Sequence, residues 1–194
     1  MTASLVIAAT TEVLRHIVDT AVQRAFNKLG GGISKPAITT GVPPNSAATD
    51  PPTVNLFLYR ATPNVMFRNL PVRDTPGAPT ALDLDYLVSA HGPVVESEIG
   101  LAAALNALHQ TAVVPPPVIR EALQRLVSHT NPVLRAIGTD DQLIDTLESI
   151  QISSSSLDLD TITRLWIAAQ APLRPSACYR VTLLSTKASP VAAS

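Results

Sequence analysis

Cysteine is almost missing from this sequence, because Cys178 is its only one. A single thiol cannot form an internal disulfide, and the composition suits a reducing compartment. A nucleophilic cysteine would need a base and a positive field nearby, whereas Ala177 and Tyr179 place Cys178 in an apolar strand pattern. We therefore predict that Cys178 is a small core residue.

Long hydrophobic runs are also lacking. The apolar run at residues 5–9 has no basic start and is too short for a signal peptide. No later stretch approaches the ~20 apolar residues that span a bilayer. We expect a protein that is made soluble, begins in the cytoplasm and does not insert directly into a membrane.

Neither sign of charge dominates the chain. Its 14 basic and 15 acidic residues give a formal net charge of −1, and Arg and Lys are scattered singly. There is thus no basic stripe to neutralise phosphates, which makes nucleic acid an unsuitable partner.

Glycine is scarce relative to proline, with 8 against 17, which predicts firm, extended connections. A hydrophobic fraction of 46% against 15% charged residues indicates a folded chain. With 194 residues it fits one domain that buries roughly 70% of its unfolded surface. We predict a single domain over residues 1–186 and a flexible carboxyl-terminal tail over residues 187–194.

Clusters that would carry chemistry are missing as well. The four histidines have no metal-site spacing, Gly30 begins a triple glycine that follows a helix instead of opening one, and Ser153 begins a serine run without a nucleophile elbow. We expect no catalytic, cofactor or metal residues. One alternative stays open, in which His91 and Asp85 converge on a pocket of a small enzyme or a monomeric binding module.

The clearest pattern present is a two-residue alternation over residues 80–92. Its apolar positions predict one core-facing side, and its polar positions predict a solvated outer side on which His91 is a turn histidine that bonds nearby backbone. A second alternating strand over residues 53–60 is expected to pair with it antiparallel. The apolar set is Leu82, Leu84, Tyr86, Val88 and Ala90, and the polar set is Asp83, Asp85, Ser89 and His91.

The remaining periodicities predict an α/β (α+β) domain, with a central mixed, largely antiparallel sheet of about four to six strands flanked by helices. Helical spacing predicts a long first helix over residues 3–29, a helix after Pro93 with a stripe of Ile99, Ala102, Leu105 and Leu108, a helix over residues 118–127, and a helix that Asp158 caps and Trp166 anchors in the core. Further strands are expected within residues 33–41, as an edge strand, and over residues 147–155 and 179–183. Residues 134–137 are ambiguous.

The connection over residues 61–79 allows two interpretations. Loops of this length are often functional or ordered by a partner. Alternatively, residues 65–67 extend the preceding strand into a longer hairpin.

Three segments together carry a family resemblance: Leu-Asp-Leu-Asp-Tyr-Leu-Val-Ser-Ala-His-Gly from Leu82, Thr-Arg-Leu-Trp from Thr163, and Leu-Arg-Pro-Ser-Ala-Cys-Tyr-Arg-Val from Leu173. They resemble the amino-terminal domain of tube-terminator (cap) proteins of extracellular contractile injection systems of the Photorhabdus virulence-cassette and antifeeding-prophage type. The order of elements is similar over nearly the whole chain.

The resemblance implies a non-enzymatic homohexameric ring, related to contractile phage tail terminators, that sits on the last layer of inner tube protein and holds the last layer of sheath protein. The chain would act in the cytoplasm as part of a phage tail-like particle, released or retained. On that basis we expect tube, sheath or neighbour contacts from two segments, the connection after residue 61 and the chain after the last strand. The residues concerned are Met66, Phe67, Arg68, Arg73, Leu184, Thr186 and Lys187.

Overall fold

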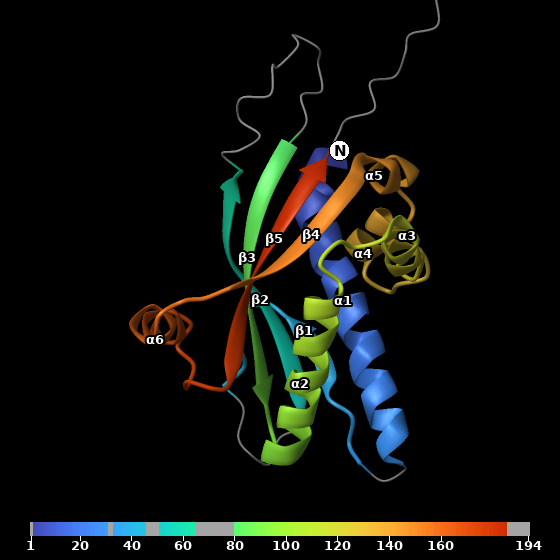
Figure 1. Ribbon diagram of the computed structural model, residues 1–194. Coiled ribbons are helices and arrows are strands. Elements are labelled where there is room, and N and C mark those ends of the chain that lie inside the picture. The colour runs from blue at the N-terminus through green and yellow to red at the C-terminus, as the bar shows by residue number, and fades with distance from the viewer. Residues whose placement is uncertain (1, 31–32, 46–50, 65–79, 186–194) are drawn as a thin grey trace, which may run out of the picture.

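The computed structural model describes residues 2–30, 33–45, 51–64 and 80–185, whose helices and strands pack around one sheet (Figure 1). The long helical pattern near the amino terminus forms a helix, and the alternating pattern over residues 80–92 forms a strand, as predicted. In chain order the elements are α1 Thr2–Leu29, β1 Ala37–Thr40, β2 Thr53–Pro63, β3 Thr80–His91, α2 Val94–Gln110, α3 Pro116–Gln124, α4 Pro132–Gly138, α5 Asp141–Thr146, β4 Leu147–Ser155, α6 Leu159–Ala168 and β5 Ser176–Ser185.

Within the described residues, the sheet has five strands in the order β1-β2-β3-β5-β4. Strand β1 pairs with β2 in parallel, and the other neighbours pair antiparallel, including the expected β2–β3 pair. The prediction of a mixed, largely antiparallel sheet in an α+β domain is therefore confirmed. The 12-residue β3 is its central strand.

The inner face of the sheet, which carries Leu84, Tyr86 and Val88, packs against the long first helix. Its buried side chains and those of α1 form one continuous core. Two tyrosines fasten helices to this face: the Tyr86 hydroxyl bonds the Thr11 hydroxyl of α1 at 2.8 Å, and the Tyr179 hydroxyl donates to the Leu105 carbonyl of α2 at 3.3 Å. Burial raises the pKa of Tyr86 to about 12, so the hydroxyl stays protonated at neutral pH.

Helix α2 buries most of the predicted stripe, because Leu108 is in the core and Ile99 and Leu105 pack against it. Ala102 is exposed, whereas Gly100, Leu101 and Ala104 are buried. A Cβ on Gly100 would lie 2.8 Å from the Pro36 ring and 3.1 Å from Val54, so the small residues mark the side where helix and sheet approach closely. The prediction was wrong for Ala102 alone, because the helix makes this close contact through its neighbours Gly100, Leu101 and Ala104.

The shorter helices end and begin at capping residues. The Asn131 side chain accepts from the Val133 amide at 2.9 Å and starts α4, which turns the ambiguous residues 134–137 into helix. Asp140 caps α5 in the same way, through the Leu143 amide at 3.1 Å. The predicted buried side of α3 is confirmed, with Ile119, Ala122, Leu123 and Leu126 in the core.

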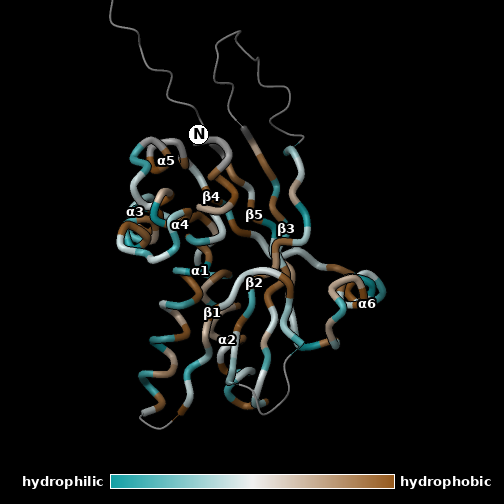
Figure 2. The backbone as a smooth tube through the Cα atoms, turned by 180° about the vertical axis from the view of Figure 1, so that it is seen from behind, coloured by the Kyte–Doolittle hydropathy of each residue, from teal (hydrophilic) through white to brown (hydrophobic). Residues whose placement is uncertain are grey.

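Of the described helices, only α6 lies on the other side of the sheet, as the two opposite views in Figures 1 and 2 show. Trp166 is 1% exposed and packs with Leu87 and Cys178 in a second, smaller core, which confirms Trp166 as a core anchor and Cys178 as a core residue. The predicted solvated side of β3 is wrong, because Asp85 and Ser89 are fully buried and His91 is 1% exposed. Alternation within one strand does not reveal a covering helix that follows 70 residues later.

Candidate functional site

The side of the sheet that α6 covers, called the outer face here, is built from rows of side chains that run across neighbouring strands. Strand pairing aligns Thr62, Asp83, Thr182 and Gln151 in one row, then Arg60, Asp85, Arg180 and Ser153, then Phe57, Leu87, Cys178 and Ser155, and finally Asn55, Ser89 and Ser176. The rows are polar at both ends of the face and apolar beneath α6. The charged side chains of this face therefore lie in a different row from the apolar side chains on which α6 packs.

A β-bulge places Arg60 in its row. Strict alternation from Val54, Leu56 and Leu58 would turn Arg60 toward the inner face, but the register shifts between Leu58 and Arg60. The extra residue, Tyr59, brings Arg60 opposite Asp85 on the outer face. Bulges commonly redirect a side chain in this way.

Asp85 is held between two arginines from the strands on either side. Its Oδ2 accepts from Arg60 Nε at 2.6 Å and its Oδ1 accepts from Arg180 Nε at 2.9 Å. The carboxylate is 0% exposed, whereas Arg60 and Arg180 are 52% and 40% exposed. The hydrogen bond and charge of Asp85 raise the pKa of Arg180. The two terminal guanidinium ends thus form a fixed, outward-facing cationic surface over a buried anion.

In the adjoining row, Asp83 is held by hydrogen bonds from uncharged side chains. Asp83 Oδ1 accepts from the Thr182 hydroxyl and from Nδ2 of the Asn64 side chain, both at 2.8 Å. These bonds tie β3 to β5 and to the residue that follows β2. At this end of the face, Asp83 and Asp85 are therefore both hydrogen-bonded within a polar network that crosses the strands.

The apolar row beneath α6 has no activated group. Burial raises the pKa of the Cys178 thiol, and burial followed by the nearby Cys178 and Asp85 raises the pKa of Tyr59 to about 12. A reactive cysteine needs the opposite shift, toward the thiolate. The Cys178 thiol and the Tyr59 hydroxyl therefore remain protonated at neutral pH, and both side chains serve in packing.

His91 is buried at the end of β3, beside Trp166. Its Nε2 bonds the Ser89 hydroxyl at 2.9 Å, so its ring has a side-chain partner instead of the expected backbone one, while its own carbonyl accepts from the Ser97 hydroxyl at 2.6 Å. Its ring centroid lies 6.0 Å from that of Trp166. Burial, followed by the positive charge of Arg174, lowers the pKa of His91 from 6.5 to about 4.

This lowered pKa predicts a loss of stability in mild acid. Between pH 6.5 and 4 the unfolded chain binds a proton at His91 that the folded chain does not. The His91 contribution is therefore complete above pH 6.5 and falls by about 3 kcal/mol as the pH drops to 4. We expect urea unfolding at a series of pH values to show a shallower decline for His91→Gln than for wild type. The exposed His109→Gln serves as control, and equal slopes for both variants would contradict the assignment.

The residues of the enzyme alternative do not come together. Asp85 and His91 lie six positions apart on one strand, each with its own partners. Neither lines the cavity of about 620 Å³ between α1, α2 and α3, nor the cavity of about 380 Å³ between α6 and β2. In the part of the chain that the structure describes, no group of three or more His, Cys, Asp or Glu could hold a metal ion.

The interaction residues expected from sequence are only partly placed. Met66, Phe67, Arg68, Arg73, Thr186 and Lys187 lie outside the described residues, while Leu184 belongs to β5 and pairs with Ala81. The hairpin alternative concerns residues 65–67, which also lie outside the described residues; the described part of β2 ends at Pro63, and the Asn64 backbone N–H donates to the Ala81 carbonyl at 2.9 Å.

Sequence reasoning missed Arg60 and Arg180, which form the charged row. Arg180 alternates with Tyr179 and Val181, and this signal could have placed it on the same face as Asp85. The bulge at Tyr59 has no comparable signal.

Among the described helices, none combines the length and apolarity needed to cross a membrane.

Comparison with known proteins matches the chain to a family model and to solved structures, two of which are described here. The family model described as the Pvc16 N-terminal domain matches residues 9–193. A cryo-EM structure of an extracellular contractile injection system, the PVC sheath/tube terminator in its extended state, is 15% identical and has a TM-score of 0.51, over 92% of this chain and 60% of that chain. The tube-terminating cap of the anti-feeding prophage is 15% identical, with a TM-score of 0.48 over 89% of this chain and 58% of that one.

The likeness to the sheath/tube terminator shows a shared fold at low identity. This chain spans about three fifths of the length of both structures. No curated protein matches the chain in sequence.

Proposed function

Because the chain belongs to the Pvc16 N-terminal domain family, we propose that it is a structural cap at the end of the tube of a contractile injection system. The family match over residues 9–193 is the observation that supports this most, since it spans the sheet and every described helix except the first residues of α1. The fold shared with a sheath/tube terminator over 92% of the chain agrees with it.

In this proposal six copies form a ring on the last layer of inner tube and hold the last layer of sheath, which ends the assembly of both. Residues 1–186 would be the ring domain and residues 187–194 a tail toward the sheath. Assembly would occur in the cytoplasm, within a phage tail-like particle. The segment with Met66, Phe67, Arg68 and Arg73 and the chain from Leu184 through Lys187 would contact tube, sheath or neighbouring copies.

The outer face supports a binding role over a catalytic one. Its buried carboxylate is already bonded by Arg60 and Arg180, and its thiol is shifted away from the reactive form. What it presents outward is guanidinium, a group well suited to carboxylates on another protein. The enzyme alternative has no observation of comparable weight.

Removal of the chain tests the proposal through particle length. Without a cap, we expect tubes to elongate beyond their normal end and the spread of particle lengths in electron micrographs to widen several-fold. Wild-type chain supplied in trans should restore the normal length. An unchanged length distribution in its absence would rule out the capping role.

The same assay tests the proposed contact segments. A chain with Arg68→Glu and Arg73→Glu should bind tubes weakly, and one without residues 187–194 should keep its ring but lose sheath more readily. Fully assembled particles with both chains would remove these segments from the proposal.

A further inference from the structure

Helix α6 has an outward side that nothing in the described chain covers. Its inward side is fixed by Trp166, but Leu159 and Ile167 are 71% and 69% exposed, and Leu173 beyond the helix is 54% exposed. Single exposed apolar residues are common, whereas three around one projecting helix indicate a contact surface. These three residues, with the exposed pair Asp160 and Arg164, are called the α6 ridge.

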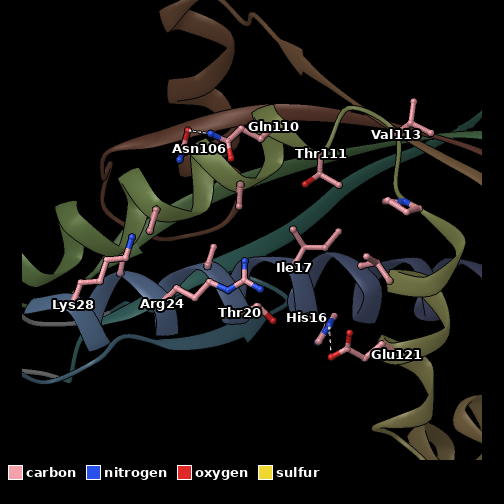
Figure 3. Close-up of a pocket in the computed structure, with 16 residues that line it drawn as sticks. His16, Ile17, Thr20, Arg24, Lys28, Asn106, Gln110, Thr111, Val113 and Glu121 are labelled. Atoms are coloured by element: carbon pink, nitrogen blue, oxygen red, sulfur yellow. Dashed lines mark hydrogen bonds and ion pairs between the residues drawn. The ribbon is translucent and has the colours of Figure 1, made fainter.

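A cavity whose length and charges suit the α6 ridge lies on the opposite side of the molecule. The cavity of about 620 Å³ runs between α1, α2 and α3, as the close-up in Figure 3 shows, and is called the helical groove. Alanines of α1 and α2, including Ala21 and Ala107, line it, and their small side chains leave room between the helices. A groove of this kind accepts another helix readily.

The two surfaces agree in length. The α1 residues that line the groove run from His16 to Lys28, which at 1.5 Å per residue is about 18 Å. Helix α6 has 10 residues and is about 15 Å long by the same rise. The helix therefore fits along the groove without overhanging it.

The charges agree as well. Arg24 and Lys28 lie toward one end of the groove and Glu121 lies at the other (Figure 3). Glu121 is bonded to Arg125 at 2.9 Å, but both side chains are more than half exposed, so this pair too can be exchanged. On the ridge, Asp160 stands near the start of α6, one turn before Arg164. The Asp160–Arg164 pair is 71–76% exposed, so its partners can be exchanged at little cost. Aligned lengthwise, Asp160 would meet Arg24 or Lys28, and Arg164 would point toward Glu121.

We propose that the α6 ridge of one copy docks into the helical groove of the next copy. The ridge cannot reach the groove of its own chain, because Trp166 holds α6 on the outer face while the groove lies beyond the inner one (Figures 1 and 2). A contact between two different surfaces on opposite sides of a subunit is head-to-tail, the kind from which rings are made. The inference rests on the ring proposed above and names its two surfaces.

Crosslinking in assembled particles tests the contact directly. We expect the chain with Ile167→Cys and Ala107→Cys to give a ladder of covalent oligomers with a short bismaleimide linker. The matched control carries Ile167→Cys and Ala102→Cys, which stands exposed on α2 outside the groove. The ladder should be absent from the control, in which the native Cys178 is buried.

The outcomes separate this contact from the capping role. Capped particles of normal length that show no ladder, or that show crosslinks to another protein, would overturn the contact and leave the cap intact. A chain missing from particle tips would overturn both.

A second variant does not depend on crosslinking. Ile167→Asp should leave the thermal midpoint unchanged but reduce the number of particles with an attached cap at least several-fold. Val94→Asp, at a similarly exposed valine outside the groove, should reduce neither the thermal midpoint nor the number of capped particles. Equal cap attachment for both variants would contradict the ridge.

Discussion

Trp166→Ala is expected to lower the free energy of unfolding by about 3–5 kcal/mol, the range typical of large aromatic residues deleted from a core. Trp166 is 1% exposed and is the largest side chain in the smaller core with Leu87 and Cys178. Its loss leaves a cavity between α6 and the sheet that the fixed strands cannot close. Urea unfolding followed by circular dichroism measures the change without relying on the single tryptophan for signal.

The neighbouring residue provides the control. Ile167 is next in sequence but 69% exposed, so Ile167→Ala should change the free energy of unfolding by no more than about 0.5 kcal/mol. Similar losses for the two variants would show that α6 is not anchored through Trp166. Because α6 carries the proposed ridge, Trp166→Ala should also reduce cap attachment, in contrast to the folded Val94→Asp.

The sequence was most informative where one periodicity coincided with one core. The alternation of β3 faces a continuous apolar layer on its inner side, and the 28-residue α1 lies along that layer, so both could be predicted from their own residues. The capping of α6 by Asp158 was equally local, since its side chain accepts from the Thr161 amide only three residues away at 2.8 Å. Such features need no knowledge of the tertiary fold.

The outer face could not be predicted because its burial depends on distant segments. Asp85 and Ser89 look like solvent-facing residues within β3, and only the placement of α6 and the two arginines shows otherwise. The sequence reading also relied on strict alternation in β2, whereas the bulge at Tyr59 changes which face Arg60 occupies. Of the charged row, the sequence pattern singles out only Asp85, either on a solvated side of β3 or beside His91 in a pocket, and neither placement matches the buried ion pair.

The same limitation applies to the surfaces proposed for assembly. Exposed residues such as Ile167 contribute no periodic signal that distinguishes a contact surface from ordinary exposure. The helical groove forms between α1 and the consecutive helices α2 and α3, which follow much later in the chain, so Lys28 and Glu121 are far apart in sequence. Function at such surfaces has to be read from the folded arrangement.

Replacing both arginines of the charged row, as Arg60→Met with Arg180→Met, is expected to lower the free energy of unfolding by about 3 kcal/mol. The change leaves the fully buried Asp85 carboxylate without its two Nε partners. The value is at the low end for a broken buried ion pair, because the arginines are 52% and 40% exposed and water can reach the site they vacate. Each single variant should lose less, since the other guanidinium remains.

Two further variants distinguish an unpaired buried charge from a simple loss of arginine. Arg164→Met removes a guanidinium bonded at 2.8 Å to the exposed Asp160 and should cost no more than about 1 kcal/mol. Adding Asp85→Asn to the double variant should recover part of the lost stability, because it removes the charge that the arginines compensated. If the double variant were no less stable than Arg164→Met, or if Asp85→Asn lowered its stability further, the buried carboxylate would not be the centre of this row.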